Sequence, residues 1–127
     1  MKNDLTIVIA HYIAKSNQKN NPLFKKKSKI VNQKNKYNIE VIIADDGSNY
    51  SKKIINNHSR QIKINDDPRN IYILEKEKLN YFLNNNNLNN DVIKKWIYLP
   101  KTVKCMSKAR VTNFAVNECS SDKILFL

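Results

Sequence analysis

Four short runs of mostly apolar residues recur along the chain, and β-branched side chains dominate several of them. They are Leu5–Ala10, Ile39–Ala44, Trp96–Leu99 and Ile124–Leu127. Runs of this length without a polar face are typical of strands buried on both sides of a parallel sheet. We therefore expect these four segments to be strands of one sheet.

Helical patterns separate the predicted strands. Residues 22–34 place apolar side chains at helical spacing after a proline suited to a first turn. A second pattern covers residues 51–61, with Ile54, Ile55 and His58 on one face, and a third covers residues 107–117. Alternating strands and helices predict right-handed βαβ units, and hence an α/β fold with a mostly parallel sheet and flanking helices.

The middle of the chain, residues 63–93, is the part that fits this alternation least. Ile71–Leu74 is compatible with a strand or with the start of a helix that runs to Leu83. Asn84–Asp91 reads N-N-N-N-L-N-N-D, a low-complexity composition that predicts an exposed loop. We expect residues 63–93 to be an insertion within a single domain that spans residues 1–127.

Candidate chemistry gathers where the second apolar run ends, at Asp45, Asp46, Gly47 and Ser48. Ligands of open α/β sheets bind beyond the carboxyl ends of the strands. A carboxylate there can accept hydrogen bonds from a nucleoside base or a ribose hydroxyl, and Gly47, the one glycine of the sequence, permits a turn with positive φ. The same four residues also suit a polar turn that caps a following helix, so the tetrapeptide alone leaves both interpretations open.

Composition narrows the class of protein. The chain has 127 residues, enough for one domain or part of one, and a formal net charge of +12. The basic residues are almost all lysine, whereas specific contacts with phosphates and bases favour arginine. Abundant Lys, Asn and Ile with little Gly also indicate codon bias, which by itself would produce a positive charge. We therefore expect no specific nucleic-acid partner. No apolar run is long enough for a transmembrane segment. Cys105 and Cys119 lack metal-ligand spacing and are expected to be free thiols in a reducing cytoplasm.

Three blocks of sequence, taken in order, resemble a known family. They are T-I-V-I-A-H-Y at Thr6–Tyr12, I-I-A-D-D-G-S at Ile42–Ser48, and the segment Ser107–Leu127 that begins S-K-A-R. Together they resemble the nucleotide-binding half of family 2 glycosyltransferases with the GT-A fold. The resemblance implies a Rossmann-like half-domain with strand order 3-2-1-4, in which Leu5–Ala10 lies between Ile39–Ala44 and Ile124–Leu127.

The resemblance also implies a set of nucleotide-binding residues: Ala10, Tyr12, Asp45, Asp46, Gly47, Ser48 and Arg110. Tyr12 matches the strand-end tyrosine beside the base, whereas Ile13 departs from the asparagine that commonly follows it. Asp46 matches the carboxylate that contacts uracil or ribose. Arg110 matches an arginine near the base and diphosphate, with the family's asparagine displaced to Asn113.

Family members continue past the last of these strands into an Asp-x-Asp motif that holds Mg²⁺ or Mn²⁺ against the diphosphate. The sequence ends at Leu127, before that position, so we expect no catalytic residue, metal ligand or cofactor within it, and a divalent cation in a longer protein. The implied substrates are a nucleotide sugar, foremost a UDP-sugar, and a glycan or lipid-linked acceptor, at a cytoplasmic site that includes the membrane surface.

Two other functions stay open from the residues themselves. One is a nucleotide-binding α/β module without transfer chemistry, and the other is a basic nucleic-acid-binding protein whose affinity would fall steeply with salt. His11 and His58 have no carboxylate or cysteine at metal spacing, and we expect them to pack or face solvent.

Overall fold

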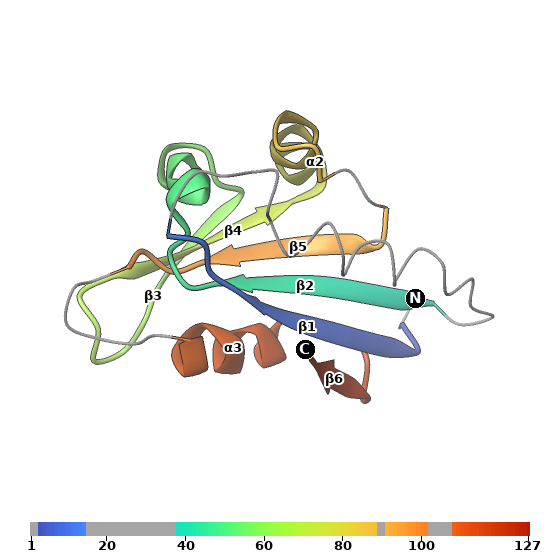
Figure 1. Cartoon of the computed structure of the whole chain (residues 1–127). Coiled ribbons are helices and arrows are strands. Elements are labelled where there is room, and N and C mark those ends of the chain that lie inside the picture. Colours follow the sequence, from blue (N-terminus) through green and yellow to red (C-terminus); the bar gives the residue numbers. More distant parts are fainter. Residues whose placement is uncertain (1–2, 15–37, 89–90, 102–107) are drawn as a thin grey trace.

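The computed structural model describes residues 3–14, 38–88, 91–101 and 108–127. In these ranges one mixed six-stranded sheet carries helices on both faces, which confirms the predicted α/β class (Figure 1). The strands are β1 (Leu5–His11), β2 (Ile39–Asp45), β3 (Arg60–Lys63), β4 (Asn70–Glu75), β5 (Ile93–Tyr98) and β6 (Ile124–Phe126). The helices are a 3₁₀ helix η2 (Asn49–Asn56) and two α-helices, α2 (Lys76–Asn85) and α3 (Lys108–Asn117).

The order of strands across the sheet is β3-β4-β5-β2-β1-β6. Strands β5, β2, β1 and β6 run parallel, and β1 lies between β2 and β6 as predicted. The last two strands, β4 and β3, continue the sheet beyond β5 in antiparallel fashion. The parallel strands therefore present their carboxyl ends at one common edge of the sheet.

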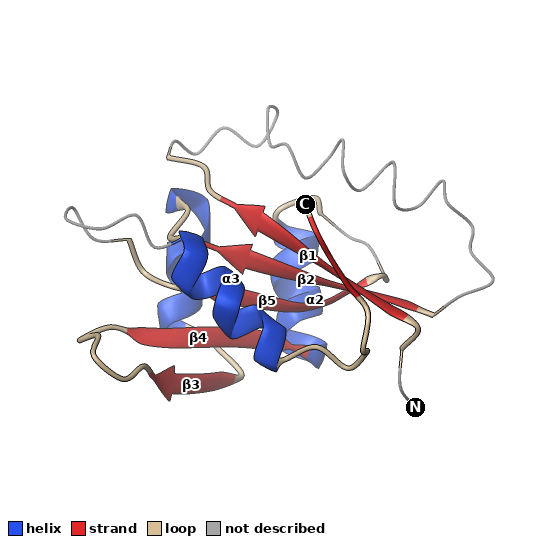
Figure 2. Cartoon of the chain, turned by 90° about the horizontal axis from the view of Figure 1, so that it is seen from below, coloured by secondary structure: helices blue, strands red, loops and turns tan. Residues whose placement is uncertain are grey.

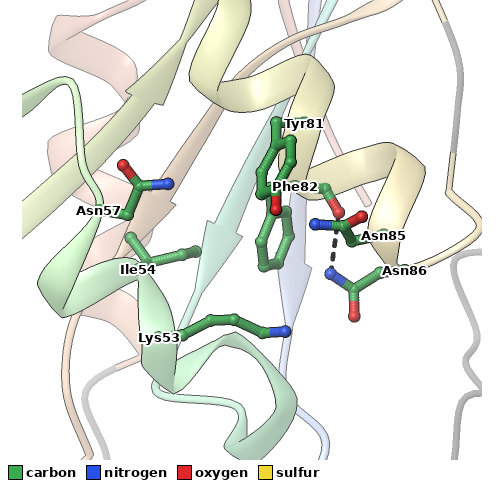
Figure 3. A pocket seen from close by; sticks show the side chains of 7 residues that line it. All are labelled: Lys53, Ile54, Asn57, Tyr81, Phe82, Asn85 and Asn86. Carbon is green, nitrogen blue, oxygen red and sulfur yellow. Dashed lines mark hydrogen bonds between the residues drawn. The ribbon is translucent and has the colours of Figure 1, made fainter.

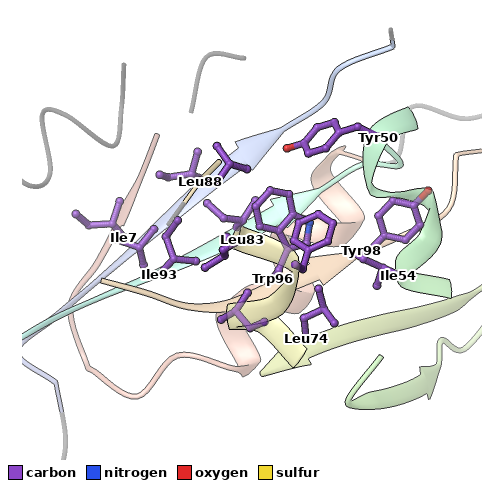
Figure 4. Close-up of a cluster of buried hydrophobic side chains, with 14 residues drawn as sticks. Ile7, Tyr50, Ile54, Leu74, Leu83, Leu88, Ile93, Trp96 and Tyr98 are labelled. Carbon is purple, nitrogen blue, oxygen red and sulfur yellow. The ribbon is translucent and has the colours of Figure 1, made fainter. Parts of the chain in front are cut away.

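Alternate residues of the strands build two separate cores. Ile7, Val41, Ile43 and Trp96 belong to the cluster beneath η2 and α2, which Figure 4 shows. The residues between them, with Val8 and Ile42 as examples, pack against α3 on the opposite face. Figure 2, in which the molecule is turned by 90° and seen from below, shows α3 lying across that second face. Both faces are covered, which explains why β1 and β2 are apolar at nearly every position.

The middle of the chain is more ordered than its composition suggests. Residues 70–75 form β4 and residues 76–85 form α2, so the strand and the helix that the pattern left as alternatives follow one another. The exposed loop predicted for residues 84–91 is wrong in part, because Asn86 and Leu88 are buried. Leu88 belongs to the hydrophobic cluster beneath η2 and α2. That residues 63–93 are an insertion relative to a family stays a prediction.

The helix predicted over residues 51–61 is wrong in its length and in its type. The structure has the 3₁₀ helix η2 up to Asn56, and Ile62 lies in β3 opposite Ile71. Ile62 pairs with β4 and packs against the core that α3 covers. These tertiary contacts determine its strand conformation, although the apolar residues before it have helical spacing. The helix predicted at residues 22–34 lies outside the described residues, whereas the one at residues 107–117 is confirmed as α3 from Lys108.

Candidate functional site at the carboxyl edge of the sheet

Three strand ends meet at the edge where the sequence places its candidate site. His11 of β1 is in register with Asp45 of β2, and Asp45 is in register with Tyr98 of β5. The loops that follow these residues carry Tyr12, residues 46–48 and Lys101. The edge is therefore assembled from three separate parts of the sequence.

Asp45 lies inside the molecule and holds the turn together. It is 0% exposed, its Oδ1 accepts the backbone N–H of Ser48 at 2.8 Å, and its Oδ2 accepts the Trp96 indole N–H at 3.0 Å. Burial raises the pKa of Asp45 to about 6 against these hydrogen bonds, which lower it. Burial, together with the charge of Asp45, raises the pKa of Tyr98 to about 12. Asp45 thus supports the site from within rather than facing a ligand.

Ser48 has a similar structural role. Its side chain is fully buried, and its Oγ accepts the backbone N–H of Ile13 at 2.9 Å. The next residue, Asn49, donates its backbone N–H to the carbonyl of Ile13 at 3.0 Å. These bonds tie the end of β1 to the turn after β2. Ser48 occupies the N-cap position of η2, as the capping interpretation predicts, but its side chain makes no capping hydrogen bond.

Gly47 adopts the positive φ that the sequence predicts, with φ of 80°. Its Cα lies directly against the segment that follows β5, because a Cβ added there would be 2.4 Å from the backbone nitrogen of Lys101. No side chain fits at that distance. Gly47 therefore brings the backbone of residue 101 next to the Asp45–Ser48 turn.

Asp46 is the carboxylate of this turn that hydrogen bonds within the described structure do not fully occupy. It is 4% exposed, and its Oδ2 accepts a hydrogen bond from the Lys101 ammonium at 2.7 Å. Its Oδ1 is buried and has no hydrogen-bond partner among the described residues. The same Lys101 ammonium lies 4.5 Å from the centre of the Tyr12 ring, which is 46% exposed. A buried acceptor without a donor costs free energy that a ligand donor would recover.

Ala10 and Arg110, the other two predicted site residues, lie on different elements. Ala10, the penultimate residue of β1, is partly buried, and its N–H donates to the carbonyl of Leu127 at 3.1 Å. Arg110 lies in the first turn of α3, is exposed, and approaches Asp67 with 3.5 Å between Nη1 and Oδ2. The structure thus places both at the same end of the sheet as Asp46.

Arg69 and Asp67, in the turn between β3 and β4, are part of this edge although the sequence analysis did not select them. Arg69 donates to both carboxylate oxygens of Asp67 and, through Nη1, to the carbonyl of Pro100 at 2.8 Å. The hydrogen bond and charge of Arg69 hold the pKa of Asp67 down at about 2. Lys101 was missed as well. No spacing rule would have found Asp67 and Arg69, because antiparallel β3 and β4 bring them to the edge.

Both histidines contact aromatic side chains in the described structure. His11 is buried, and its Nε2 lies 2.5 Å from the hydroxyl oxygen of Tyr50. His58 packs its ring 5.0 Å from that of Tyr72. Within the described ranges no group of three or more His, Cys, Asp or Glu side chains could hold a metal ion.

A separate hollow of about 70 Å³ lies between η2 and α2 (Figure 3). Its lining includes Ile54, Phe82 and Asn86, whose amide donates to the carbonyl of Phe82 at 2.8 Å. It contains none of the residues predicted for the site. The hollow has room for a few water molecules, so it does not compete with the strand edge as a nucleotide site.

Comparisons with protein-family models, with curated proteins and with solved structures gave no match. No helix in the part of the chain that the structure describes is long and apolar enough to cross a membrane.

Proposed function

We propose that the carboxyl edge of β1, β2 and β5 binds the nucleoside part of a nucleotide sugar, with a UDP-sugar as the first candidate. Asp46 carries the proposal, because it is a buried carboxylate at the place where open α/β sheets bind ligands, and one of its oxygens has no hydrogen-bond partner among the described residues. Tyr12 offers an exposed aromatic face beside it. Arg110 in the first turn of α3 supplies a cation for the diphosphate.

The resemblance to family 2 glycosyltransferases extends this proposal to a biological role. In that role the chain is the nucleotide-binding portion, in a Rossmann-like GT-A half-domain, of an enzyme that transfers the sugar to a glycan or lipid-linked acceptor. The strand order β5-β2-β1-β6 agrees with the order that the resemblance implies. The divalent cation that the resemblance implies is part of this proposal.

The test is the affinity of the chain for UDP, measured by calorimetry, with Asp46→Ala as the variant. We expect the variant to bind UDP about tenfold more weakly or worse, because a ligand N–H would lose a charged acceptor worth about 1 to 3 kcal/mol. Asp91→Ala is the matched control, since Asp91 is exposed and precedes β5 at the opposite edge. Equal affinities of the Asp46 variant and the unmodified chain would rule out this site.

The second candidate function is a nucleotide-binding module without transfer chemistry. It shares the same edge and the same dependence on Asp46, so the Asp46 variant does not separate the two. The two functions are separated by comparing UDP with a UDP-sugar. A transferase portion is expected to bind a UDP-sugar at least as tightly as UDP. A module built for the nucleotide alone is expected to bind UDP more tightly, because it has no space for the hexose.

A further inference from the structure

The Lys101 ammonium occupies the space between the two groups that would receive a nucleobase. It donates to Oδ2 of Asp46 at 2.7 Å and lies over the Tyr12 ring at 4.5 Å from its centre. A base that stacked on Tyr12 and donated an N–H to Asp46 would need the same space. The ammonium satisfies both groups with interactions of the same kind, a hydrogen bond to the carboxylate and a cation on the ring face.

We propose that Lys101 closes the nucleobase site of the ligand-free chain, and that a base binds by replacing its ammonium. The inference depends on the proposed function, since it concerns how the same site takes its ligand. It makes Lys101 a residue that sets both affinity and selectivity. A ligand that displaces the ammonium must itself bring an N–H donor, because otherwise a buried carboxylate stays without a partner.

Neighbouring residues hold the backbone at residue 101, so we expect displacement to involve its side chain alone. Gly47 packs against the backbone of Lys101 so closely that a Cβ would be 2.4 Å from its nitrogen. On the preceding residue, the carbonyl of Pro100 accepts a hydrogen bond from Arg69 at 2.8 Å. The segment is held from two sides, and opening the site requires no movement of the strand-end loops.

Exposure of the side chains shows which partner can leave. The Lys101 side chain is 32% exposed, whereas that of Asp46 is 5% exposed. Rotation about its flexible stem carries the ammonium into water, where it is fully solvated. Asp46 has no such route. Opening therefore leaves the buried carboxylate without its cation, and an N–H of the incoming base has to take the place of the ammonium.

The experiment measures binding of uridine, a neutral probe, to the unmodified chain, to Lys101→Met and to Lys94→Met by calorimetry. Lys94 is an exposed lysine of β5 and controls for the loss of one positive charge. We expect Lys101→Met to bind uridine up to about fivefold more tightly, since the competing ion pair is gone, and Lys94→Met to behave as the unmodified chain. With 3-methyluridine, which has no imide N–H, we expect weaker binding to all three proteins.

A salt series on the unmodified chain tests the same inference without a substitution that could harm folding. Salt screens the exposed ammonium, and uridine carries no charge, so its affinity should rise with ionic strength towards that of Lys101→Met. Lys101→Met itself should show no such rise. The thermal transitions of both variants, recorded in parallel, confirm that they are folded.

The failures of the two proposals are distinguishable. Weaker or unchanged uridine binding by Lys101→Met, together with loss of binding in Asp46→Ala, would keep the site and overturn the role of Lys101 as a competitor. Uridine affinity of the unmodified chain that falls or stays constant with salt would do the same. Absence of uridine and UDP binding in all the proteins would overturn the proposed function and this inference with it.

Discussion

Neighbouring residues of one turn have opposite roles because their surroundings differ. Asp45 has both oxygens occupied by N–H donors from the protein, and Ser48 uses its hydroxyl on the backbone of Ile13. Asp46, one residue further on, has one oxygen on Lys101 and one without a partner in the described structure. A D-D-G-S sequence is therefore both the polar turn and the candidate ligand site, with the two functions divided between the carboxylates.

Gly47→Ala is expected to destabilise the chain by about 2 kcal/mol or more, for two reasons. A non-glycine residue at φ of 80° is strained, and the new methyl group would collide with the Lys101 backbone, which cannot move aside as a side chain end can. Denaturant unfolding monitored through the buried Trp96 measures the loss. Asn87→Ala is the control, because Asn87 also has positive φ, at 55°, but is exposed. Similar losses in both variants would show that the close contact at Gly47 has no energetic effect.

At the scale of elements, one buried carboxylate joins the centre of the sheet to the loop between α3 and β6. Oε2 of Glu40, on β2, accepts the hydroxyl of Thr6 on β1 at 2.7 Å and the backbone N–H and hydroxyl of Ser120 at 2.7 and 2.6 Å. Burial alone would raise the pKa of Glu40, but the bonds from Ser120 and Thr6 outweigh it and hold the pKa below its ordinary value. The short strand β6 is thus positioned by this loop as well as by its pairing with β1.

Glu40→Gln is expected to lower the free energy of unfolding by about 1 to 3 kcal/mol, because charge-assisted hydrogen bonds become neutral ones. Amide hydrogen exchange should become faster first at Ser120 and at Leu127. The N–H of Leu127 donates a hydrogen bond to the carbonyl of Val8. Glu77→Gln, on the exposed first turn of α2, is the control and should change stability by less than about 1 kcal/mol. Unchanged exchange at Ser120 would mean that the carboxylate does not hold this loop.

Elements whose own residues determine their structure could be predicted from the sequence, whereas elements that depend on tertiary pairing could not. Strands β1 and β2 were predictable because burial on both faces makes them apolar throughout, and α3 because Val111 and Ala115 lie on one face. The strand β3 was not, since Ile62 has strand geometry only through its pairing with β4. The turn around Gly47 was predictable from residue type, whereas Lys101 and Arg69 reach the site through tertiary packing that no local pattern records.

At the scale of the whole molecule, carboxylates in different places act in opposite directions on stability. The pKa of Asp45 is raised to about 6, so the folded chain binds a proton more readily than the unfolded chain between about pH 6 and pH 4. In that window the Asp45 contribution to stability grows as pH falls. The pKa values of Glu40 and Asp67 are lowered, so their contributions are present at neutral pH and are lost only as pH falls below about 4.

Asp45→Asn isolates the first of these effects. The amide does not titrate, so the unfolding free energy of the unmodified chain minus that of the variant should increase on going from pH 7 to pH 4.5. The expected increase is on the order of 2 to 3 kcal/mol, because each pKa unit corresponds to about 1.4 kcal/mol. Urea unfolding at the two pH values measures it, and the groups that both proteins share cancel in the subtraction. A difference that stays constant, or that shrinks on acidification, would mean that the charged form of Asp45 is as stable in the folded chain as in water. The two N–H donors of Asp45 would then have to compensate for its complete burial.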